Sequence, residues 1–209
     1  YGTPRILDLL DYELIRNNPK VFVGYSDISC LHIAFNKYSN LVTFHGPMLT
    51  SDMAGDFSDF SMNSLLNSIS NEEFNPLIRN ATEEMITINE GIAEGEIIGG
   101  NLSLIVSTLG TPYEIDTKGK ILFIEEIGEY TYKIDRMLTQ LRLAKKLEEA
   151  EGIILGNFNK CLPEGKDDFT LEEVFDQIIR PLNKPTIYNL QAGHCEPVVT
   201  IPFGVKAKL

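Results

Sequence analysis

The chain has 209 residues, of which 43% are hydrophobic and 23% are charged, enough to bury a sizeable core in one large domain or two small ones. Its net charge of −12 argues against nucleic-acid binding, which needs a basic patch, and no apolar run approaches the length of about 20 residues that spans a membrane. The three cysteines lie far apart without a CxxC pair, so we expect neither a disulfide framework nor a zinc site. With no secretion signal visible, we expect a reducing cytoplasmic location.

The first part of the chain predicts an α/β unit. Residues 4–16 carry apolar side chains at helical spacing, and Pro19 disfavours continuing that helix. Residues 21–26 predict a buried parallel strand, because they are apolar on both faces. A helix over 27–38 and a strand over 41–47 follow, and strand–helix–strand order is typical of α/β folds.

A change in composition, from a polar segment to glycine-rich alternating strands, predicts two domains, residues 1–78 and 79–209. Residues 50–80 are polar with one helix near 61–69, and residues 71–84 read as the boundary region. Glycine-rich alternating strands follow over 85–110. The remaining predicted elements are a strand ending in carboxylates at 118–130, a helix at 132–147, a buried strand at 152–158, a helix at 170–182 with a Thr170–Glu173 capping signal, and a turn-rich, strand-like end at 185–209.

The turn at Gly24-Tyr25-Ser26 is the first candidate for chemistry. A serine on a sharp strand-to-helix turn exposes its hydroxyl, and the next backbone N–H can bind an oxyanion. The motif is a partial nucleophile elbow, because Ile28 stands where a lipase-type elbow has its second glycine. The alternative is that Ser26 only caps the helix, and from this stretch alone that structural role is the more common one.

A serine nucleophile needs a base, and the chain has three histidines. His32 falls inside the predicted helix and is interpreted as structural. His45 ends the second strand, so it is near Ser26 in principle. His194 sits in a loop between Gly193 and Cys195, where it can be aimed. Position slightly favours His194 and leaves His45 as a close alternative.

The acid that would orient the base is sought at a strand end. Glu125 and Glu126 end an apolar strand, and Glu129 follows them; α/β proteins place their sites at this end of a strand. The alternative is that these carboxylates are exposed to solvent at the end of the strand and have no catalytic role. Gly99-Gly100-Asn101 lacks the spacing of a nucleotide-binding loop and predicts a turn or a close backbone approach instead.

Taken together, these segments resemble a known family. The strings GYSDIS, FHGPM, KGKILFIEEIGEYTYKIDRMLTQL, GIILGNF and GHCEPVVTIPFGVKAKL occur in order across essentially the whole chain. They closely resemble the bacterial LD-carboxypeptidases, serine peptidases also called muramoyltetrapeptide carboxypeptidases. That family has a further strand and helix before a GGYG motif that survives here as Tyr1-Gly2, and a short final strand, so we expect a fragment lacking both.

The resemblance implies a fold and a site. The fold is an N-terminal Rossmann-like α/β domain, incomplete here, and a smaller C-terminal swivelling α/β domain, in a homodimer. The site implied is a Ser26–Glu125–His194 triad with no metal and no other cofactor. The backbone N–H groups of Asp27 and Gly2 would be the oxyanion donors. His45, Glu126 and Glu129 would then have no catalytic role.

The resemblance also implies a reaction and a partner, namely hydrolysis of the L-D peptide bond that releases terminal D-alanine from a cytoplasmic murein tetrapeptide during cell-wall recycling. No nucleic acid or membrane takes part. One alternative is a microcin-immunity-type peptidase of the same superfamily, although the tryptophan that such relatives tend to carry for stacking on a nucleobase is absent. Another is a peptide-binding relative without catalysis.

Overall fold

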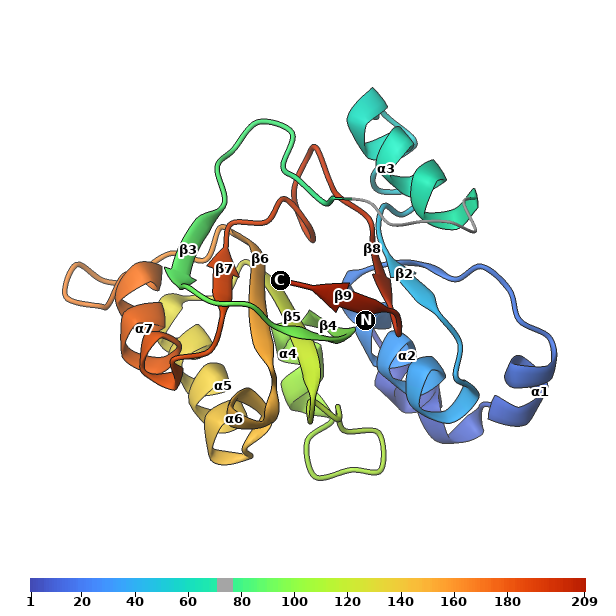
Figure 1. Cartoon of the computed structure of the whole chain (residues 1–209), viewed down its shortest axis with the longest axis horizontal. Helices are drawn as coiled ribbons and strands as arrows, with labels where there is room; N and C mark the ends of the chain where they lie inside the picture. The colour runs from blue at the N-terminus through green and yellow to red at the C-terminus, as the bar shows by residue number, and fades with distance from the viewer. Residues whose placement is uncertain (71–76) are drawn as a thin grey trace.

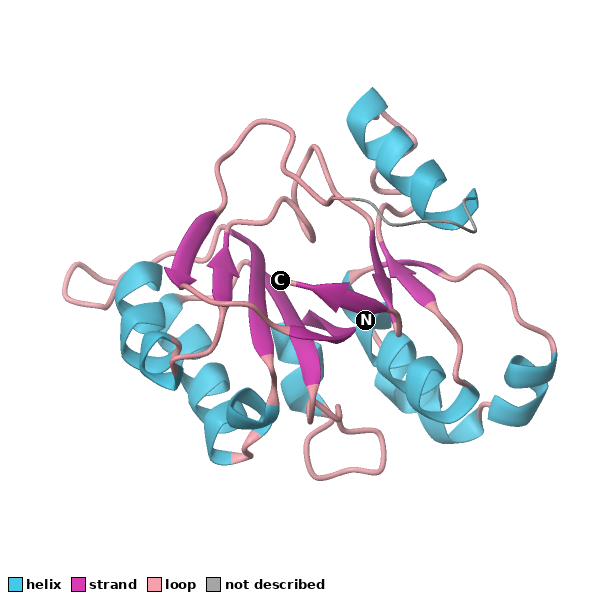
Figure 2. Cartoon of the chain, in the orientation of Figure 1, coloured by secondary structure: helices cyan, strands magenta, loops and turns pink. Residues whose placement is uncertain are grey.

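The computed structural model describes residues 1–70 and 77–209, and the chain forms two β-sheets flanked by helices (Figure 1). The larger sheet has the strand order β3-β7-β6-β5-β4-β9, and the smaller sheet has the order β1-β2-β8. The strands are β1 Val23–Gly24, β2 Thr43–His45, β3 Ile86–Asn89, β4 Glu94–Asn101, β5 Lys120–Ile127, β6 Gly152–Asn159, β7 Thr186–Tyr188, β8 Ile201–Phe203 and β9 Lys206–Lys208 (Figure 2).

The helices fall into separate groups around these sheets. In Figure 1, α5, α6 and α7 lie together along one side, α1 and α2 lie on the other, and α3 stands apart near β2 and β8. The helices are η1 Thr3–Leu9, α1 Tyr12–Asn17, η2 Ser26–Ile28, α2 Ser29–Ala34, a π-helical turn η3 Phe35–Ser39, α3 Asp59–Ser70, α4 Leu102–Ser107, α5 Thr131–Leu143, α6 Lys146–Glu149, α7 Leu171–Ile178 and η4 Arg180–Leu182.

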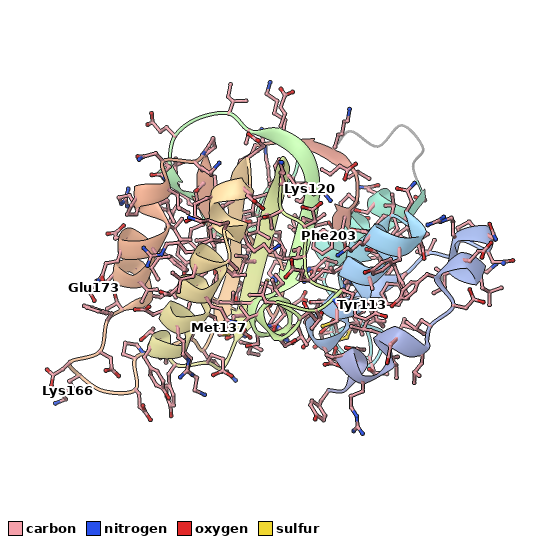
Figure 3. The ribbon with its side chains drawn as sticks, turned by 90° about the horizontal axis from the view of Figure 1, so that it is seen from below. Tyr113, Lys120, Met137, Lys166, Glu173 and Phe203 are labelled. Carbon is pink, nitrogen blue, oxygen red and sulfur yellow. The ribbon has the colours of Figure 1, made fainter. Side chains whose placement is uncertain are left out.

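The two faces of β5 pack on different cores, because successive side chains of a strand point to opposite faces. Leu122 and Ile124 pack into the core formed with the helices, whereas Ile121 and Phe123 pack into a core shared with Phe203 of β8. Figure 3 shows Phe203 between the two halves of the molecule and Met137 of α5 on the helical side. The predicted buried face of the 132–147 helix is confirmed, since its core side chains are fully buried: Ile134, Leu138 and Leu141.

The smaller sheet joins the two ends of the chain. Strands β1 and β2 are parallel, as predicted, and β2 pairs antiparallel with β8, which comes from the last ten residues. The predicted mixed α/β class is therefore confirmed. The predicted division at residues 78 and 79 stays a prediction, and residues 71–76 of the predicted boundary lie outside the described residues.

The single helix predicted over residues 4–16 is wrong. The segment divides into η1 and α1, because the Asp11 side chain accepts a hydrogen bond from the Leu14 N–H and starts a new helix. Ile6 and Leu14, two of the apolar side chains at helical spacing in this segment, are exposed, whereas Leu7 is buried.

Helices α7 and α4 each begin at a residue whose side chain caps the helix N-terminus. The predicted capping box at the start of α7 is confirmed, because Thr170 and Glu173 exchange side-chain and backbone hydrogen bonds. The strand reading of residues 85–110 misses α4, which begins where the Asn101 side chain accepts the Leu104 N–H. The short apolar segment after Asn101 is ambiguous between strand and helix by its pattern alone.

None of the helices in the described residues has the length and apolar character needed to cross a membrane.

Candidate active site

Ser26 is the first residue of η2, at a strained turn that follows β1. Its φ of 66° lies in the left-handed region that non-glycine residues rarely adopt, and such strain costs about 1–3 kcal/mol and is concentrated at functional sites. Gly24 at the same turn has a φ of 149°, and a Cβ there would lie 2.5 Å from the Ile28 side chain. The helix-cap alternative for Ser26 is wrong, because neither η2 nor α2 has a side-chain cap hydrogen bond.

The N-terminal segment packs against this turn. The Thr3 N–H donates to Asp27 Oδ2 at 2.9 Å, and the Thr3 hydroxyl donates to the Asp27 carbonyl oxygen. Burial alone would raise the pKa of Asp27, but hydrogen bonds from Thr3 and the Gly2 amide hold that pKa below its ordinary value. The structure therefore places Gly2 and Asp27, the two predicted oxyanion residues, beside the Ser26 turn.

The buried Glu125 and the partly buried His194 form a pair at the end of β5. The His194 Nδ1 atom lies 2.6 Å from Glu125 Oε2, and the His194 N–H donates to the same oxygen at 3.3 Å. The Glu125 side chain is 0% exposed, and its burial raises the pKa of the carboxyl while the neighbouring His194 opposes the shift. An ionised Glu125 selects the tautomer with the proton on Nδ1, which leaves Nε2 free to accept a proton.

The loop carrying His194 approaches β5 too closely for a side chain at residue 193. Gly193 has a φ of 105°, and a Cβ on it would lie 2.5 Å from Glu125 Oε2. On the other side, the Asn159 side chain donates to the His194 carbonyl oxygen at 2.7 Å. A glycine and an amide therefore fix the backbone from which the imidazole projects.

Glu126 serves the opposite face of β5. Its carboxylate accepts hydrogen bonds from the Asn101 side chain at 2.7 Å and from the Ser103 N–H and hydroxyl at 2.8 and 2.6 Å. Glu125 and Glu126 are both buried, so the alternative of a solvated strand end is wrong. Glu129 lies at the surface in an ion pair with Lys133 at 2.7 Å.

His32 and His45 are fully buried and lack a carboxylate partner in the described residues. His32 Nε2 donates to the Gly24 carbonyl oxygen at 2.9 Å, and burial lowers the pKa of His32 to about 4. The His45 ring packs 4.9 Å from the Phe123 ring, and burial lowers its pKa well below the ordinary value. Of the two histidines left open by the sequence, His194 is the one that the structure pairs with an acid.

Tyr25 connects the Ser26 turn to His194. Its ring centroid lies 4.7 Å from that of the His194 imidazole, with the ring planes at 87°, and Ser26 is the next residue in the chain. Within the described residues no hydrogen bond joins the Ser26 hydroxyl to His194. Such contacts are often long in unliganded enzymes. The sequence patterns did not identify Tyr25 as part of this site. The available signal was its position directly before Ser26.

Among the described residues, no group of three or more His, Cys, Asp and Glu side chains could hold a metal ion.

The chain belongs to the LD-carboxypeptidase family. Residues 94–209 match the family's C-terminal domain, and residues 1–46 match its N-terminal domain. The family resemblance drawn from the sequence is therefore confirmed.

Relatives and solved structures agree with this assignment. The chain is 44% identical over 213 residues to the probable murein peptide carboxypeptidase of Bacillus subtilis (strain 168), covering 100% of this chain and 66% of that protein. It is 30% identical to the muramoyltetrapeptide carboxypeptidase of Oxalobacter formigenes, whose crystal structure superposes with a TM-score of 0.84 over 100% of this chain and 71% of that chain.

The microcin C7 self-immunity protein MccF of Escherichia coli is 26% identical over 229 residues, covering 96% of this chain and 66% of that protein. Its structure in complex with glutamyl sulfamoyl guanosine has a TM-score of 0.85 at 24% identity, covering 97% of this chain and 68% of that chain, which shows the shared fold. The chain spans 66% of the length of the first curated relatives that it matches.

Proposed function

We propose that the protein is a serine LD-carboxypeptidase that releases terminal D-alanine from a murein tetrapeptide. The observation that carries the proposal is the pairing of the buried Glu125 with His194, 2.6 Å between Oε2 and Nδ1. The His194 ring in turn contacts Tyr25 at the strained Ser26 turn. The names of the relatives supply the substrate class, since one is a probable murein peptide carboxypeptidase and another a muramoyltetrapeptide carboxypeptidase.

In the proposed mechanism, His194 Nε2 takes the proton from Ser26, whose oxygen attacks the carbonyl carbon of the L-D peptide bond. Glu125 holds the imidazole tautomer and stabilises its protonated form. The backbone N–H of Asp27 would bind the oxyanion, and the Gly2 N–H would join it on turning away from the Asp27 carboxylate. Each such donor contributes about 3–4 kcal/mol in comparable sites. His194 then protonates the leaving amine of D-alanine, and water hydrolyses the acyl-enzyme.

The proposal includes the setting of the reaction. The enzyme would act in the cytoplasm as a homodimer, with residues 1–78 supplying Ser26 and residues 79–209 supplying Glu125 and His194. It would use no metal, so EDTA is expected to leave turnover unchanged. Inhibition by EDTA that zinc or magnesium reverses would contradict this mechanism.

A microcin-immunity-type activity is the second candidate, favoured by the likeness to MccF. The absence of tryptophan weighs against it if a stacked nucleobase is part of recognition. A glutamyl sulfamoyl nucleotide offered in parallel with the tetrapeptide separates the two activities.

The decisive experiment incubates the protein with tetrapeptides ending in L-Lys-D-Ala and in diaminopimelyl-D-Ala, and measures released D-alanine by mass spectrometry. We expect release by the parent and none by Ser26→Ala or His194→Ala, each with its fold retained. Release by Ser26→Ala would exclude Ser26 as nucleophile. Without any release, labelling of the parent by a phosphonate probe would indicate a different amide substrate, whereas no labelling would favour the non-catalytic relative.

A further inference from the structure

Glu125 alone does not determine the orientation of the His194 ring. The side-chain contact between Nδ1 and Glu125 Oε2 is a single hydrogen bond, about which the imidazole plane can still tilt. The direction of Nε2, the atom that would face Ser26, depends on that plane. A second contact to the ring is therefore needed to aim it.

Tyr25 supplies that contact. Its ring is nearly perpendicular to the imidazole at a centroid distance of 4.7 Å, a favourable edge-to-face arrangement. Tyr25 is 7% exposed, so its ring is held by packing, and it is joined covalently to Ser26. A displacement of Tyr25 would therefore move the nucleophile and the base together.

Asp52 fixes Tyr25 in turn. The Tyr25 hydroxyl donates to Asp52 Oδ1 at 2.9 Å, and Asp52 Oδ2 accepts the Met48 N–H at 2.6 Å. Burial and the nearby Asp52 raise the pKa of Tyr25, so the phenol remains a hydrogen-bond donor. A phenylalanine at residue 25 would fill the same space without this hydrogen bond. The bond to Asp52 therefore fixes the orientation of the Tyr25 ring and adds little buried area.

We propose that Tyr25, tied to Asp52, is a positioning residue that holds the His194 imidazole with Nε2 directed toward Ser26. The inference rests on the proposed function for its catalytic consequence. Its structural content, a fixed ring plane at His194, is independent of the substrate.

The chain offers a matched control. Phe22 makes an edge-to-face contact with the buried His32 at 5.2 Å and 72°, a histidine outside the proposed triad. Tyr25→Leu and Phe22→Leu each remove an aromatic ring from a histidine, and Tyr25→Phe removes only the hydroxyl. All three variants, with the parent, are assayed for kcat and KM on the tetrapeptide and for thermal unfolding.

For Tyr25→Leu we expect kcat to fall about 30-fold or more with little change in KM, because small misplacements of a catalytic group can cost about 100-fold in rate. Tyr25→Phe keeps the ring and should lose roughly 3- to 10-fold on the same grounds. Phe22→Leu should lower the unfolding temperature with kcat nearly unchanged. Equal losses of kcat in Phe22→Leu and Tyr25→Leu, or a parent-like kcat in Tyr25→Leu, would overturn the proposal.

A second measurement works even if the tetrapeptide is not the substrate. NMR of ¹⁵N-histidine-labelled protein reports the protonated ring nitrogen and the mobility of each imidazole. We expect one sharp Nδ1–H signal for His194 in the parent and a signal broadened by ring motion in Tyr25→Leu. A His194 signal unchanged by Tyr25→Leu would refute the positioning role, whereas failure to release D-alanine from any tetrapeptide would bear on the proposed function alone.

Discussion

Neighbouring residues of β5 have separate tasks because a strand alternates its faces. Glu125 points with Ile121 and Phe123 toward the smaller sheet and meets His194, whereas Glu126 points toward the helices and binds the first turn of α4. Chemical identity does not distinguish the two carboxylates. Their direction from the strand does.

Substituting each glutamate with glutamine tests this division. We expect Glu125→Gln to lower kcat by about 10³- to 10⁴-fold, as when the acid of a serine triad is replaced by its amide. Glu126→Gln should instead lower the unfolding temperature, because an amide has one acceptor oxygen for the donors that now surround a carboxylate. Kinetics and thermal melts of both variants check the prediction, and a larger loss of kcat in Glu126→Gln would reverse the assignment.

Gly193→Ala tests the close approach of the His194 loop. The new Cβ would lie 2.5 Å from Glu125 Oε2, so we expect loss of the hydrogen bond to His194 and of turnover. Gly110→Ala is the control, because Gly110 also has a positive φ of 77° but no atom within 4 Å of a Cβ. It should destabilise the protein by about 1 kcal/mol with kcat retained. Turnover surviving in Gly193→Ala would show that the loop has room to move.

At the scale of elements, α3 holds the segment that follows His194. The Ser61 hydroxyl, fully buried, accepts the Val198 N–H at 2.8 Å, and the Ser64 hydroxyl accepts the Thr200 N–H at 2.9 Å. These serines lie three positions apart and so share one face of the helix. The backbone N–H groups of Val198 and Thr200 lie in a segment without regular structure. They find their acceptors on a helix about 136 residues earlier in the chain.

Ser61→Ala should therefore destabilise the protein by about 1–3 kcal/mol, the usual effect of leaving a buried donor unpaired. Urea unfolding measures the loss, and hydrogen exchange should show faster exchange at the Val198 amide. Ser70→Ala on the same helix is the control, since Ser70 is exposed and, among the residues that the structure describes, its hydroxyl bonds within α3. Equal effects of the two substitutions would mean that α3 does not support this segment.

At the scale of the whole molecule, two buried histidines lie where the sheets meet. The His45 ring contacts Phe123 of the larger sheet and Phe203 of the smaller one, and the His32 ring also contacts Phe203. A charged imidazole there would be desolvated without a carboxylate partner. The junction of the sheets is thus sensitive to acid.

We expect the free energy of unfolding to fall as the pH drops from about 6.5 toward 4. The pKa of His32 falls from 6.5 in the unfolded chain to about 4 in the folded protein, so the unfolded state binds more protons in this window. The loss from His32 is about 3 kcal/mol at the acid end, and His45 acts in the same direction. Glu125, whose folded pKa is raised, acts in the opposite direction.

Urea unfolding at several pH values measures this dependence, with His32→Gln as the comparison. Glutamine can donate to the Gly24 carbonyl oxygen but does not titrate, so its curve should be flatter across this window. Parallel curves for parent and variant would show that His32 does not contribute.

Features that depend on near neighbours were determined by the sequence alone. The buried face of α5 follows from its spacing, the start of α7 from its capping box, and the turn at Ser26 from Gly24 within an apolar-to-helical transition. The motifs in order along the chain also identified the family. These are short-range properties, in which backbone geometry and hydrogen bonding act within a few residues.

Only the tertiary structure decided which distant groups meet. His194 rather than His45 pairs with Glu125 across 69 residues, β8 returns to pair with β2, and Asp52 ties Tyr25 across 27 residues. The burial of Leu7, rather than of Ile6 or Leu14, was likewise decided by tertiary packing. These contacts depend on how distant segments pack together and on which face of the sheet each side chain occupies. The local pattern of apolar and polar residues does not encode either.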